Sequence, residues 1–352
     1  MKTIKQVIGV DVAQNELVCA FGQLHEDLSI GRYVHQVFNN NLKGFNNLIR
    51  WIQSIKSADL SLQIVMEPTG VYHEKFAHWL FNQDYDVAIV LPNKISNYAR
   101  TLSIKTITDK TASQTIAQFG LERKLDLWSP PKPIFRTMKQ LTRERDQIVA
   151  ERVTIKNQIH AENTEAYPNR NSLKRLKARK ALLSKQEQEI KNEIQQLVKS
   201  DPKIEKDIGL MTTIPGVGNL TAAIVLAETN GFELIRNKRQ LTSYAGLDVR
   251  EKQSGTSVKG KPRISKQGNR YVRKAMHLPS LSAIRHCQLY KSNFTMHVSK
   301  HGIKMKAAVA VQRKILELMF VIYKTKTPFD PYYEFKKGQQ YVVDAPSQSS
   351  LC

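Results

Sequence analysis

The stretch Gln6–Ala13, QVIGVDVA, decides how the first part of this 352-residue chain folds. It is apolar and rich in β-branched side chains, which favours a strand. It also carries one carboxylate, Asp11, between Val10 and Val12. A carboxylate on an apolar strand is costly to bury without a partner. The stretch therefore predicts a core strand. Its single acid, Asp11, should have an interaction partner elsewhere in the chain.

The segments after this strand alternate between strand and helix patterns. The predicted strands are Leu17–Phe21, Tyr33–Phe38, Leu62–Met66 and Val87–Leu91, and the predicted helices are Lys43–Ile55, Tyr72–Asn82, Lys94–Leu102 and about Thr111–Leu121. Three meandering strands followed by alternating strands and helices predict an α/β fold with a mixed sheet. This order is similar to that of the ribonuclease H-like fold, which includes the RuvC-type nucleases.

A proline-rich break at Ser129–Pro133 marks the end of this α/β domain. Beyond it, apolar residues recur at heptad spacing in two long helical stretches, first at Leu141, Ile148 and Ile155, then at Leu176, Leu183, Ile190 and Leu197. This pattern predicts an antiparallel coiled-coil hairpin, either self-contained or serving as an assembly surface. The predicted domains are 1–130, a RuvC-like domain; 131–205, the hairpin; 206–335, a mainly helical C-terminal domain; and 336–352, a disordered tail.

The net charge of +23 points to a polyanionic partner. Nucleic acid is favoured over an anionic membrane surface, because the sequence has no basic amphipathic anchor helix. No apolar run approaches the roughly 18–20 residues of a membrane span. The three cysteines are too few and too scattered for a disulfide framework or a zinc site. A bacterial cytoplasmic protein associated with the nucleoid is the expectation.

Three acids are placed where they could share a metal ion. Asp11 is in the first strand, Glu67 ends the fourth at Ile64–Gly70 (IVMEPTG), and Asp109 precedes the last helix of the domain. In a ribonuclease H-like topology the first and fourth strands are neighbours, so Asp11 and Glu67 would meet at one end. Oxygen ligands of this kind suit Mg²⁺, with Mn²⁺ as an alternative. A structural role for each acid alone is the competing interpretation.

The C-terminal region carries the strongest basic signal. From Arg236 to Lys274 there are twelve Lys or Arg residues against two acids, which suits contact with a phosphate backbone. The predicted nucleic-acid contacts are Gly216 and Gly218, in a helix–hairpin–helix-like turn within Met211–Glu228, together with Ser257, Lys259, Lys261, Arg263, Lys266, Asn269, Arg270 and Arg273. Within this run Ser254 is either a loop residue or a nucleophile activated from elsewhere.

Several short motifs, taken in order, resemble those of the insertion sequence 110 family of transposases, its 1111 branch in particular, which also includes the Piv-type DNA invertases. The matching segments are residues 8–13, 66–72, 108–110, 214–218, 244–247, 254–260 and 264–269. The resemblance implies an Asp-Glu-Asp-Asp set in a RuvC-like domain and a serine, here Ser254, that joins covalently to DNA. It also implies a structured guide RNA that pairs with donor and target DNA. Because strand exchange needs at least two cut duplexes held together, we expect a dimer or tetramer built through the helical hairpin. Catalytic roles for Ser254, Asp11, Glu67 and Asp109 follow from the resemblance, with Ser257 as the fallback nucleophile.

One position departs from the family pattern. The third and fourth acids are usually spaced Asp-x-x-Asp, but Ala112 stands three residues after Asp109. Either three acids suffice, or Thr111 or Ser113 helps through water, or the chain is an altered or inactive form. Two other functions stay open beside the RNA-guided recombinase: a metal-dependent, junction-selective nuclease that uses water, and a non-catalytic nucleic-acid-binding protein.

Overall fold

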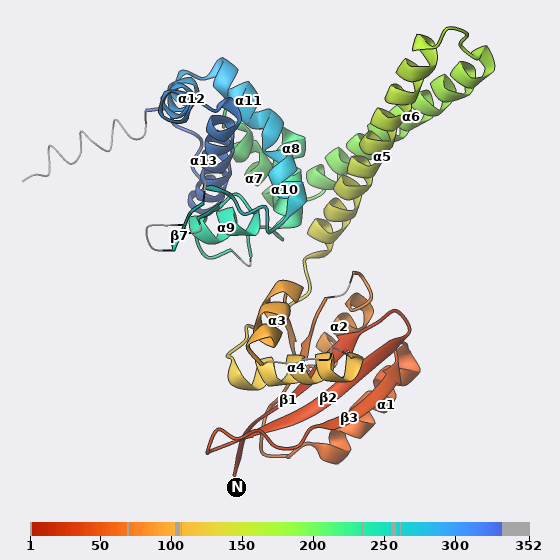
Figure 1. Cartoon of the computed structure of the whole chain (residues 1–352), viewed down its shortest axis with the longest axis vertical. Coiled ribbons are helices and arrows are strands. Elements are labelled where there is room, and N and C mark those ends of the chain that lie inside the picture. The colour runs from red at the N-terminus through yellow and green to blue at the C-terminus, as the bar shows by residue number, and fades with distance from the viewer. Residues whose placement is uncertain are drawn as a thin grey trace, which may run out of the picture. The chain divides into compact units, whose positions relative to one another are not determined.

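The computed structural model describes residues 2–332 except 69, 103–105, 107, 234, 252, 255–257 and 261, and only the backbone of 253, 254, 258 and 259. The chain divides into two compact units, Met1–Pro130 and Pro131–Cys352 (Figure 1). The further boundary near residue 205 stays a prediction, since the hairpin belongs to the second unit. The predicted tail, 336–352, lies outside the described residues.

A mixed five-stranded sheet forms the centre of the N-terminal unit. Its strands are β1 (Thr3–Val12), β2 (Glu16–His25), β3 (Val34–Asn39), β4 (Leu62–Met66) and β5 (Asp86–Ile89), in the order β3-β2-β1-β4-β5. The first three strands run antiparallel, and β4 pairs in parallel with both β1 and β5. The predicted mixed sheet, with the first and fourth strands as neighbours, is confirmed.

Helices cover both faces of this sheet (Figure 1). The alternation of side chains along β1 sends Ile8 and Val10 into one core with α1 (Leu42–Ile55) and α2 (Glu74–Phe81). Val7 points into a second core with α3 (Pro92–Ala99) and α4 (Asp109–Glu122). A short 3₁₀ turn, Arg100–Leu102, follows α3. Asp11 shares the face of Val7, and therefore the side of the sheet on which α4 lies.

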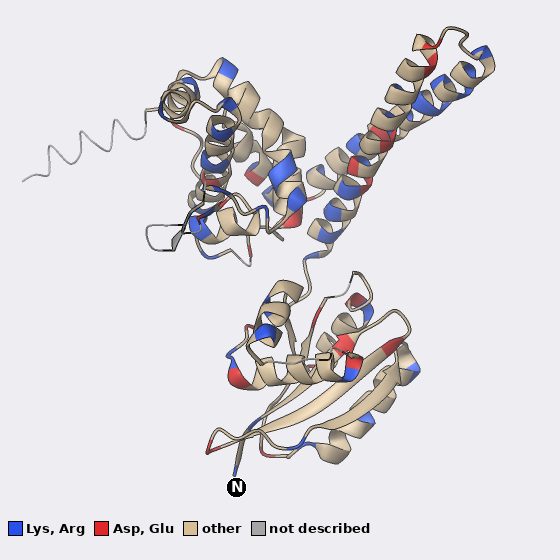
Figure 2. Cartoon of the chain, in the orientation of Figure 1, with Lys and Arg blue, Asp and Glu red and all other residues tan. Residues whose placement is uncertain are grey.

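Two long helices begin the C-terminal unit. They are α5 (Pro133–Thr164) and α6 (Arg170–Lys199), which pack side by side as a hairpin (Figure 1). Leu141, Ile148 and Ile155 of the predicted heptads are buried on α5, and Ile190 is buried on α6. Basic residues, with fewer acidic ones among them, are spread along the hairpin (Figure 2). The predicted pair of long helices is confirmed.

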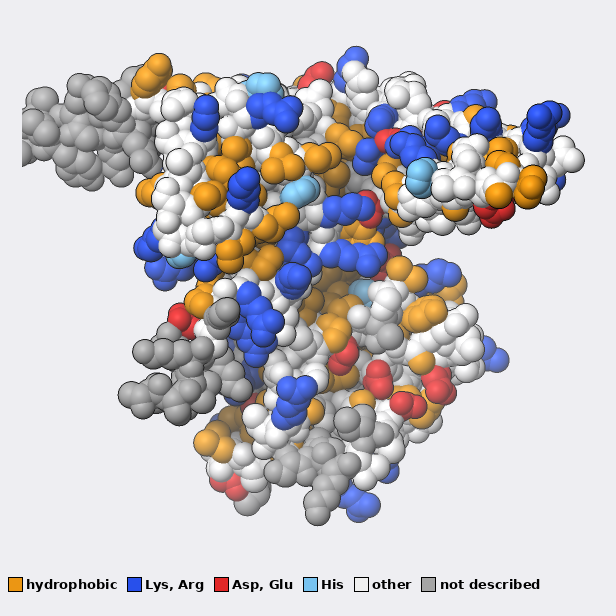
Figure 3. Space-filling view, turned by 45° about the horizontal axis from the view of Figure 1, so that its top comes forward, with side chains coloured by type: hydrophobic (Ala, Val, Ile, Leu, Met, Phe, Trp, Pro, Cys, Tyr) orange, Lys and Arg blue, Asp and Glu red, His pale blue; other side chains and the backbone are white. Residues whose placement is uncertain are grey.

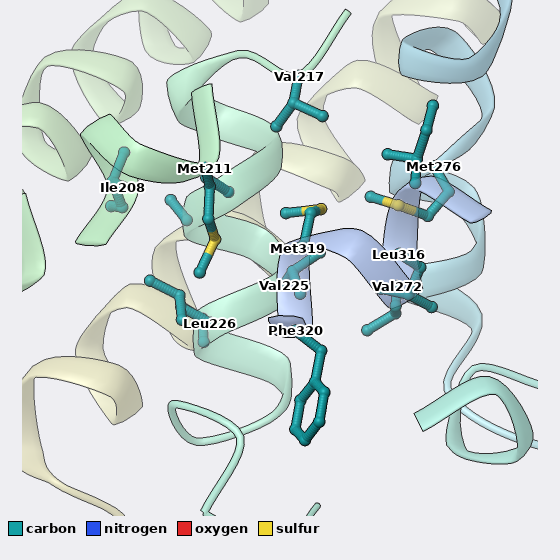
Figure 4. Packing of buried hydrophobic residues seen from close by; sticks show 14 of the residues in the cluster. Ile208, Met211, Val217, Val225, Leu226, Val272, Met276, Leu316, Met319 and Phe320 are labelled. Atoms are coloured by element: carbon teal, nitrogen blue, oxygen red, sulfur yellow. The ribbon is translucent and has the colours of Figure 1, made fainter. Parts of the chain in front are cut away.

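The remaining helices enclose one apolar core. They are α7 (Pro202–Thr212), α8 (Asn219–Glu228), α9 (Lys238–Tyr244), α10 (Arg270–Ala275), α11 (His277–His286), α12 (Gln288–His301) and α13 (Lys304–Thr325). Met211, Leu226, Val272 and Met319 point toward one another in this core (Figure 4). The first turns of α5 join it through Phe135 and Met138. The hairpin therefore grows directly out of the C-terminal core.

The structure differs from the sequence-based expectation at α12. The sequence predicts closing helices at Tyr271–Ile284 and Ile303–Tyr323 and no element between them. Gln288–His301 lacks the regular apolar stripe by which a helix is recognised. Only Tyr290 of this helix is buried, so most of it faces solvent. Among the described helices, none combines the length and the apolar character that crossing a membrane requires.

Candidate active site

Asp11 and Glu67 lie at the same end of two neighbouring parallel strands. Val10 and Met66 are the last residues that pair between β1 and β4, and each acid directly follows one of them. Both acids are partly exposed. Carboxyl ends of parallel strands are the usual location of ligand sites in open α/β sheets. The register of this pair therefore presents two carboxylates at one edge of the sheet.

Gly9 allows α4 to lie directly on β1. A Cβ at Gly9 would lie 2.2 Å from the backbone nitrogen of Ala117 and 2.2 Å from the carbonyl oxygen of Ser113. No larger residue fits without moving the helix. Gly9 and Asp11 share one face of the strand, so α4 is held over the face from which Asp11 projects. Asp109 is the first residue of α4, and its negative charge raises the pKa of Asp11.

Lys5 fixes the other end of α4. Its Nζ donates hydrogen bonds to the carbonyl oxygens of Gly120 (2.5 Å) and Arg123 (2.8 Å) at the C-terminus of the helix. A cation is favourable there because the helix dipole is negative at that end. Burial lowers the pKa of Lys5. No local sequence pattern signals this contact, because its partners are more than a hundred residues away.

Burial raises the pKa of both Asp11 and Glu67. The charge of Asp109 adds to the rise at Asp11, and the charge of Asp11 adds to the rise at Glu67. A backbone hydrogen bond at Val12 opposes the rise at Asp11. Mutually repelling, half-buried carboxylates are groups that gain from a nearby cation or a shared proton.

The described residues do not form a closed metal centre. Within them, no three His, Cys, Asp or Glu side chains are close enough together to hold an ion. The side chain of Ala112 has no oxygen to offer a metal ion. The hydroxyls of Thr111 and Ser113, on either side of it, are bonded to other groups. Thr111 Oγ1 accepts from the amide of Thr108 (2.8 Å) in a capping box, and the buried Ser113 Oγ donates to Lys110 (2.9 Å).

The segment that carries Ser254 leaves the C-terminal unit through a closed stem. Strand β6 (Val249–Arg250) pairs with β9 (Arg263–Ile264) in antiparallel fashion. Directly before and after these strands, Ser265 Oγ donates to Asp248 Oδ1 (2.5 Å), and the amide of Ser265 donates to the Asp248 carbonyl (2.9 Å). The two ends of the basic segment are therefore locked together.

Two sequence motifs interlock beneath the stem. They are Tyr244-Ala245-Gly246-Leu247 and the segment 264–269. The amide of Asn269 donates to the carbonyl of Tyr244 (2.6 Å), and that of Lys266 donates to the carbonyl of Gly246 (3.1 Å). Gly268, with φ of 152°, lies so close that a Cβ would be 2.4 Å from the Tyr244 carbonyl oxygen. The two motifs form one structural unit that carries the serine segment.

Ser254 itself lies in a short ribbon beyond the stem. Strand β7 (Gln253–Ser254) pairs with β8 (Val258–Lys259), and Ser254 is opposite Val258. Ser254 is thus the last described residue of β7 and is paired across the ribbon. Only the backbone of Ser254 and Lys259 is described. Ser257 and Lys261 lie outside the described residues.

Asn269, predicted to contact phosphate, has its side chain engaged inside the protein. Its Oδ1 caps α10 by accepting from the amides of Tyr271 (2.9 Å) and Val272 (3.1 Å). Its Nδ2 donates to Glu228 Oε2 (2.7 Å), and this carboxylate also accepts two hydrogen bonds from Arg143 (2.7 and 2.9 Å). An Asn just before a helix is a common cap, and that signal could have identified this role from sequence.

The predicted cationic contacts fall into two groups. Arg263, Lys266 and Arg270 are exposed. Arg273 is partly buried, and its Nη1 donates to the carbonyl of Ala245 (2.7 Å), so it also braces the interlocked motifs. The exposed group remains available for an external anion. Figure 3 shows such basic side chains interspersed with hydrophobic ones on one face of the molecule.

The two predicted glycine contacts also differ. Gly216 has φ of 88°, and a Cβ there would lie 2.3 Å from the carbonyl oxygen of Pro279 in α11. It therefore holds the α7–α8 turn against α11. Gly218, the N-cap of α8, is exposed and has no atom within 4 Å of its Cβ position. Gly218 is the better placed of the two to approach a phosphate.

Comparison with known proteins identifies the chain. Residues 8–168 match a model of DEDD-type transposases related to IS110, described as "Transposase", and residues 209–295 match "Transposase IS116/IS110/IS902 family". The chain belongs to the IS110 family of transposases. The first match includes Asp11, Glu67 and Asp109, and the second includes the interlocked motifs and Ser254. A transposase of this family acts as a DNA transposase or recombinase.

Individual relatives agree with this assignment. The pilin gene-inverting proteins of Moraxella bovis and Moraxella lacunata are each 28% identical over 329 residues, which covers 93% of this chain and 98% of theirs. An uncharacterized protein of the insertion element IS110 from Streptomyces coelicolor is 26% identical over 121 residues, 34% of this chain and 30% of that protein. The two Moraxella relatives thus align with both units of the transposase.

Proposed function

We propose that this IS110-family transposase cleaves and rejoins DNA strands through a covalent bond between Ser254 and a DNA phosphate. The observation that carries the proposal is the closed stem: β6, β9 and the interlocked motifs are built to hold a short ribbon that contains Ser254. A serine that was only an ordinary loop residue would not require this support. Asp11, Glu67 and Asp109 are proposed as the assisting acids.

The chemistry is a phosphodiester exchange. Ser254 Oγ attacks the phosphorus, a bond forms between Oγ and phosphorus, and the bond from phosphorus to one sugar oxygen breaks. The hydroxyl proton passes to a carboxylate, and the departing sugar oxygen takes up a proton. One of the three assisting acids, Asp11, Glu67 or Asp109, would accept the serine hydroxyl proton as general base. Attack by another sugar hydroxyl then reverses these steps on a new strand and frees the serine.

The acids fit a divalent cation in the kind of donor they offer. Asp11 and Glu67 would hold Mg²⁺ or Mn²⁺, with Asp109 acting on the same ion or through water, since Mg²⁺ keeps several waters. The rise in pKa that burial and mutual repulsion cause at Asp11 and Glu67 supports this assignment. When bound, such an ion supplies charge stabilisation at the phosphate. The N-terminal unit is then proposed to be a RuvC-like, ribonuclease H-like domain.

The proposed partners are donor and target DNA together with a structured guide RNA. A net charge of +23 supports a protein that binds long phosphate backbones while base pairing supplies the sequence specificity. The relatives named for pilin gene inversion support inversion as one outcome of the reaction. We also propose a bacterial cytoplasmic location, in association with the nucleoid.

Strand exchange needs at least two cut duplexes held together, so we propose a dimer or tetramer. The α5–α6 hairpin is the proposed assembly surface, as a coiled coil that extends between protomers. Exposed apolar side chains support this role: Leu182 is 56% and Tyr167 93% exposed on the hairpin. Scattered exposed apolar residues are common, so the test is the oligomeric state of a Leu182→Glu variant by light scattering.

A denaturation-resistant protein–DNA adduct tests the nucleophile. Wild-type protein incubated with substrate DNA, guide RNA and Mg²⁺ should form an adduct that survives detergent, and Ser254→Ala should abolish it. Ser257→Ala tests the fallback nucleophile: if this substitution abolishes the adduct and Ser254→Ala does not, the nucleophile is Ser257. If Ser254→Ala still cuts and leaves free ends, a nuclease that uses water is the correct function. If wild type and Asp11→Ala are equally inert on every substrate, the protein only binds nucleic acid.

A further inference from the structure

A pocket at the foot of the serine stem is not explained by the functions above. It has a volume of about 410 Å³ and lies between α12, α13 and the β6–β9 strand pair. We call it the stem pocket. That volume is in the range of small-molecule sites, which run from about 300 to 1,000 Å³. The pocket opens beside the two strands from which the segment carrying Ser254 departs.

The walls of the stem pocket combine an apolar surface with basic groups. Val309 and Ala310 of α13 face Val249 and Ile264 of the strand pair, and Leu247 adds to the same apolar lining. Small side chains at adjacent positions of α13 leave the space open, whereas Lys306 and Arg313 follow on the same helix face at i, i+7 spacing. The pocket is thus an apolar slot flanked by cations on one helix.

The charge in the stem pocket is unbalanced. Glu317 is the one acid among its lining residues, and it is already bonded to Arg313 Nε (3.0 Å) and Thr242 Oγ1 (3.1 Å). Within the described part of the chain, Lys306 and Arg263 have no acidic partner. Two uncompensated cations beside an apolar slot suit a ligand that is part anion and part flat, apolar ring.

Two imidazoles complete the pocket. His297 and His301 are one turn apart on α12, with ring centroids 6.3 Å apart and planes only 12° from parallel. Loss of hydration, together with the charges of Lys306 and Lys300, lowers the pKa of His301. Aromatic ring faces are surfaces on which unpaired bases stack.

We propose that the stem pocket holds one unpaired nucleotide of the strand next to the phosphate that the Ser254 segment approaches. The phosphate of that nucleotide contacts Lys306 and Arg263, and its base lies in the slot between Val309, Ala310 and the His297 ring. This inference rests on the proposed nucleic-acid function and adds to it a recognition element for distorted or unpaired strands. The extra nucleotide can come from DNA or from RNA, because the phosphate and the base are common to both.

Binding of labelled duplexes to the full-length protein tests the proposal. Fluorescence anisotropy compares a perfect DNA duplex with the same duplex carrying one extra, bulged nucleotide, at a fixed salt concentration. Wild type should bind the bulged duplex about tenfold more tightly, the size expected of one stacked base. A DNA–RNA hybrid with the bulge in either strand shows which strand supplies the nucleotide. 2-Aminopurine at the bulge should lose fluorescence on binding if its base stacks.

Three variants separate the pocket from the general basic surface. Ala310→Phe fills the slot and should remove the preference for the bulge, with affinity for the perfect duplex within about twofold of wild type. Lys306→Gln changes an exposed residue, so it should fold normally and should reduce the preference. Lys291→Gln removes the same charge from the exposed surface of α12, away from the pocket, and should keep the preference.

The outcomes distinguish this inference from the proposed function. If wild type binds both duplexes equally, or if Ala310→Phe and Lys306→Gln retain the preference, the pocket does not hold a nucleotide, and the nucleic-acid function stands. If the wild-type protein binds no duplex and no hybrid at any salt concentration, both the pocket and the proposed function are wrong.

Discussion

Asn269 donates a hydrogen bond of 2.7 Å to Glu228, whose carboxylate is completely shielded from solvent. The same carboxylate accepts two hydrogen bonds from Arg143 at the base of the hairpin. Asn269 in turn caps α10 and binds the carbonyl of Tyr244. One buried acid therefore connects the α5–α6 hairpin to the stem that carries Ser254.

Removing this acid should be severely destabilising. Glu228→Ala leaves the guanidinium of Arg143 half-buried without its partner, and such losses cost about 3–5 kcal/mol. Thermal unfolding of the full chain should show a large fall in the melting temperature of the C-terminal unit. Asp146→Ala is the control, because Asp146 binds the exposed Lys274 and the loss of such a surface pair costs about 0–1 kcal/mol. Equal effects of the two substitutions would mean that Glu228 does not stabilise the connection between the hairpin and the stem.

The same substitution should destabilise the protein much more at Gly216 than at Gly218. Gly216→Ala forces a side chain into a backbone conformation with φ of 88° and against the Pro279 carbonyl oxygen. Strain of this kind costs about 1–3 kcal/mol, before any movement of α11. Gly218→Ala meets open space and has an extended backbone, so its effect on unfolding should be below about 1 kcal/mol. Urea titrations of both variants measure the difference.

The outline of the N-terminal unit could be predicted from the sequence because its elements are regular. Apolar alternation in Gln6–Ala13 and the helix–strand order specify a mixed sheet, and parallel pairing then brings Asp11 and Glu67 to one edge. What the pattern does not contain is the position of α4 on the sheet. That depends on the missing side chain at Gly9 and on the cap from Lys5, which are tertiary contacts without a local signature.

The C-terminal unit was less predictable for the same physical reason. Motif residues such as Asn269 and Arg273 stand out by composition as phosphate contacts, yet the structure uses them to brace the chain. The partners of Glu228 are 85 and 41 residues away, so no periodicity reveals them. Helix α12 was not predicted, because a helix with a single buried side chain has no apolar stripe to detect.

The hairpin contains an acid whose contribution should depend on pH. Glu187 of α6 is 3% exposed and forms ion pairs with Arg145 (2.8 Å), Lys191 (3.0 Å) and Arg152. Burial alone would raise the pKa of Glu187, but the hydrogen bond from Lys191 and the nearby charges of Arg145 and Arg152 lower it. A lowered pKa means that the ionised form stabilises the folded state above the ordinary pKa of glutamate, and that this stability is lost as the pH falls through the lowered value.

Glu187→Gln should therefore destabilise the hairpin at pH 7 and have a smaller effect at pH 3. The melting temperature of the α5–α6 region, followed by circular dichroism of the full chain at both pH values, measures this difference. Glu189→Gln is the matched control on the same helix. Glu189 is exposed, and its ion pair with Lys185 is long at 3.8 Å and open to solvent. A Glu187→Gln effect that is the same at pH 3 and pH 7 would show that packing, and not charge, accounts for it.

Restoring the missing fourth acid tests the metal assignment. Ala112 is three residues after Asp109 on α4, so an aspartate there would project from the same side of the helix. Ala112→Asp should strengthen Mn²⁺ binding by about tenfold, because another carboxylate joins a site that already repels its own charges. The readout is the increase in melting temperature of the N-terminal unit on Mn²⁺ addition, which Asp11→Asn should remove in both backgrounds. Without metal, Ala112→Asp should lower stability slightly through like-charge repulsion. An Mn²⁺ response that is unaffected by both substitutions would place the ion away from Asp11 and from position 112.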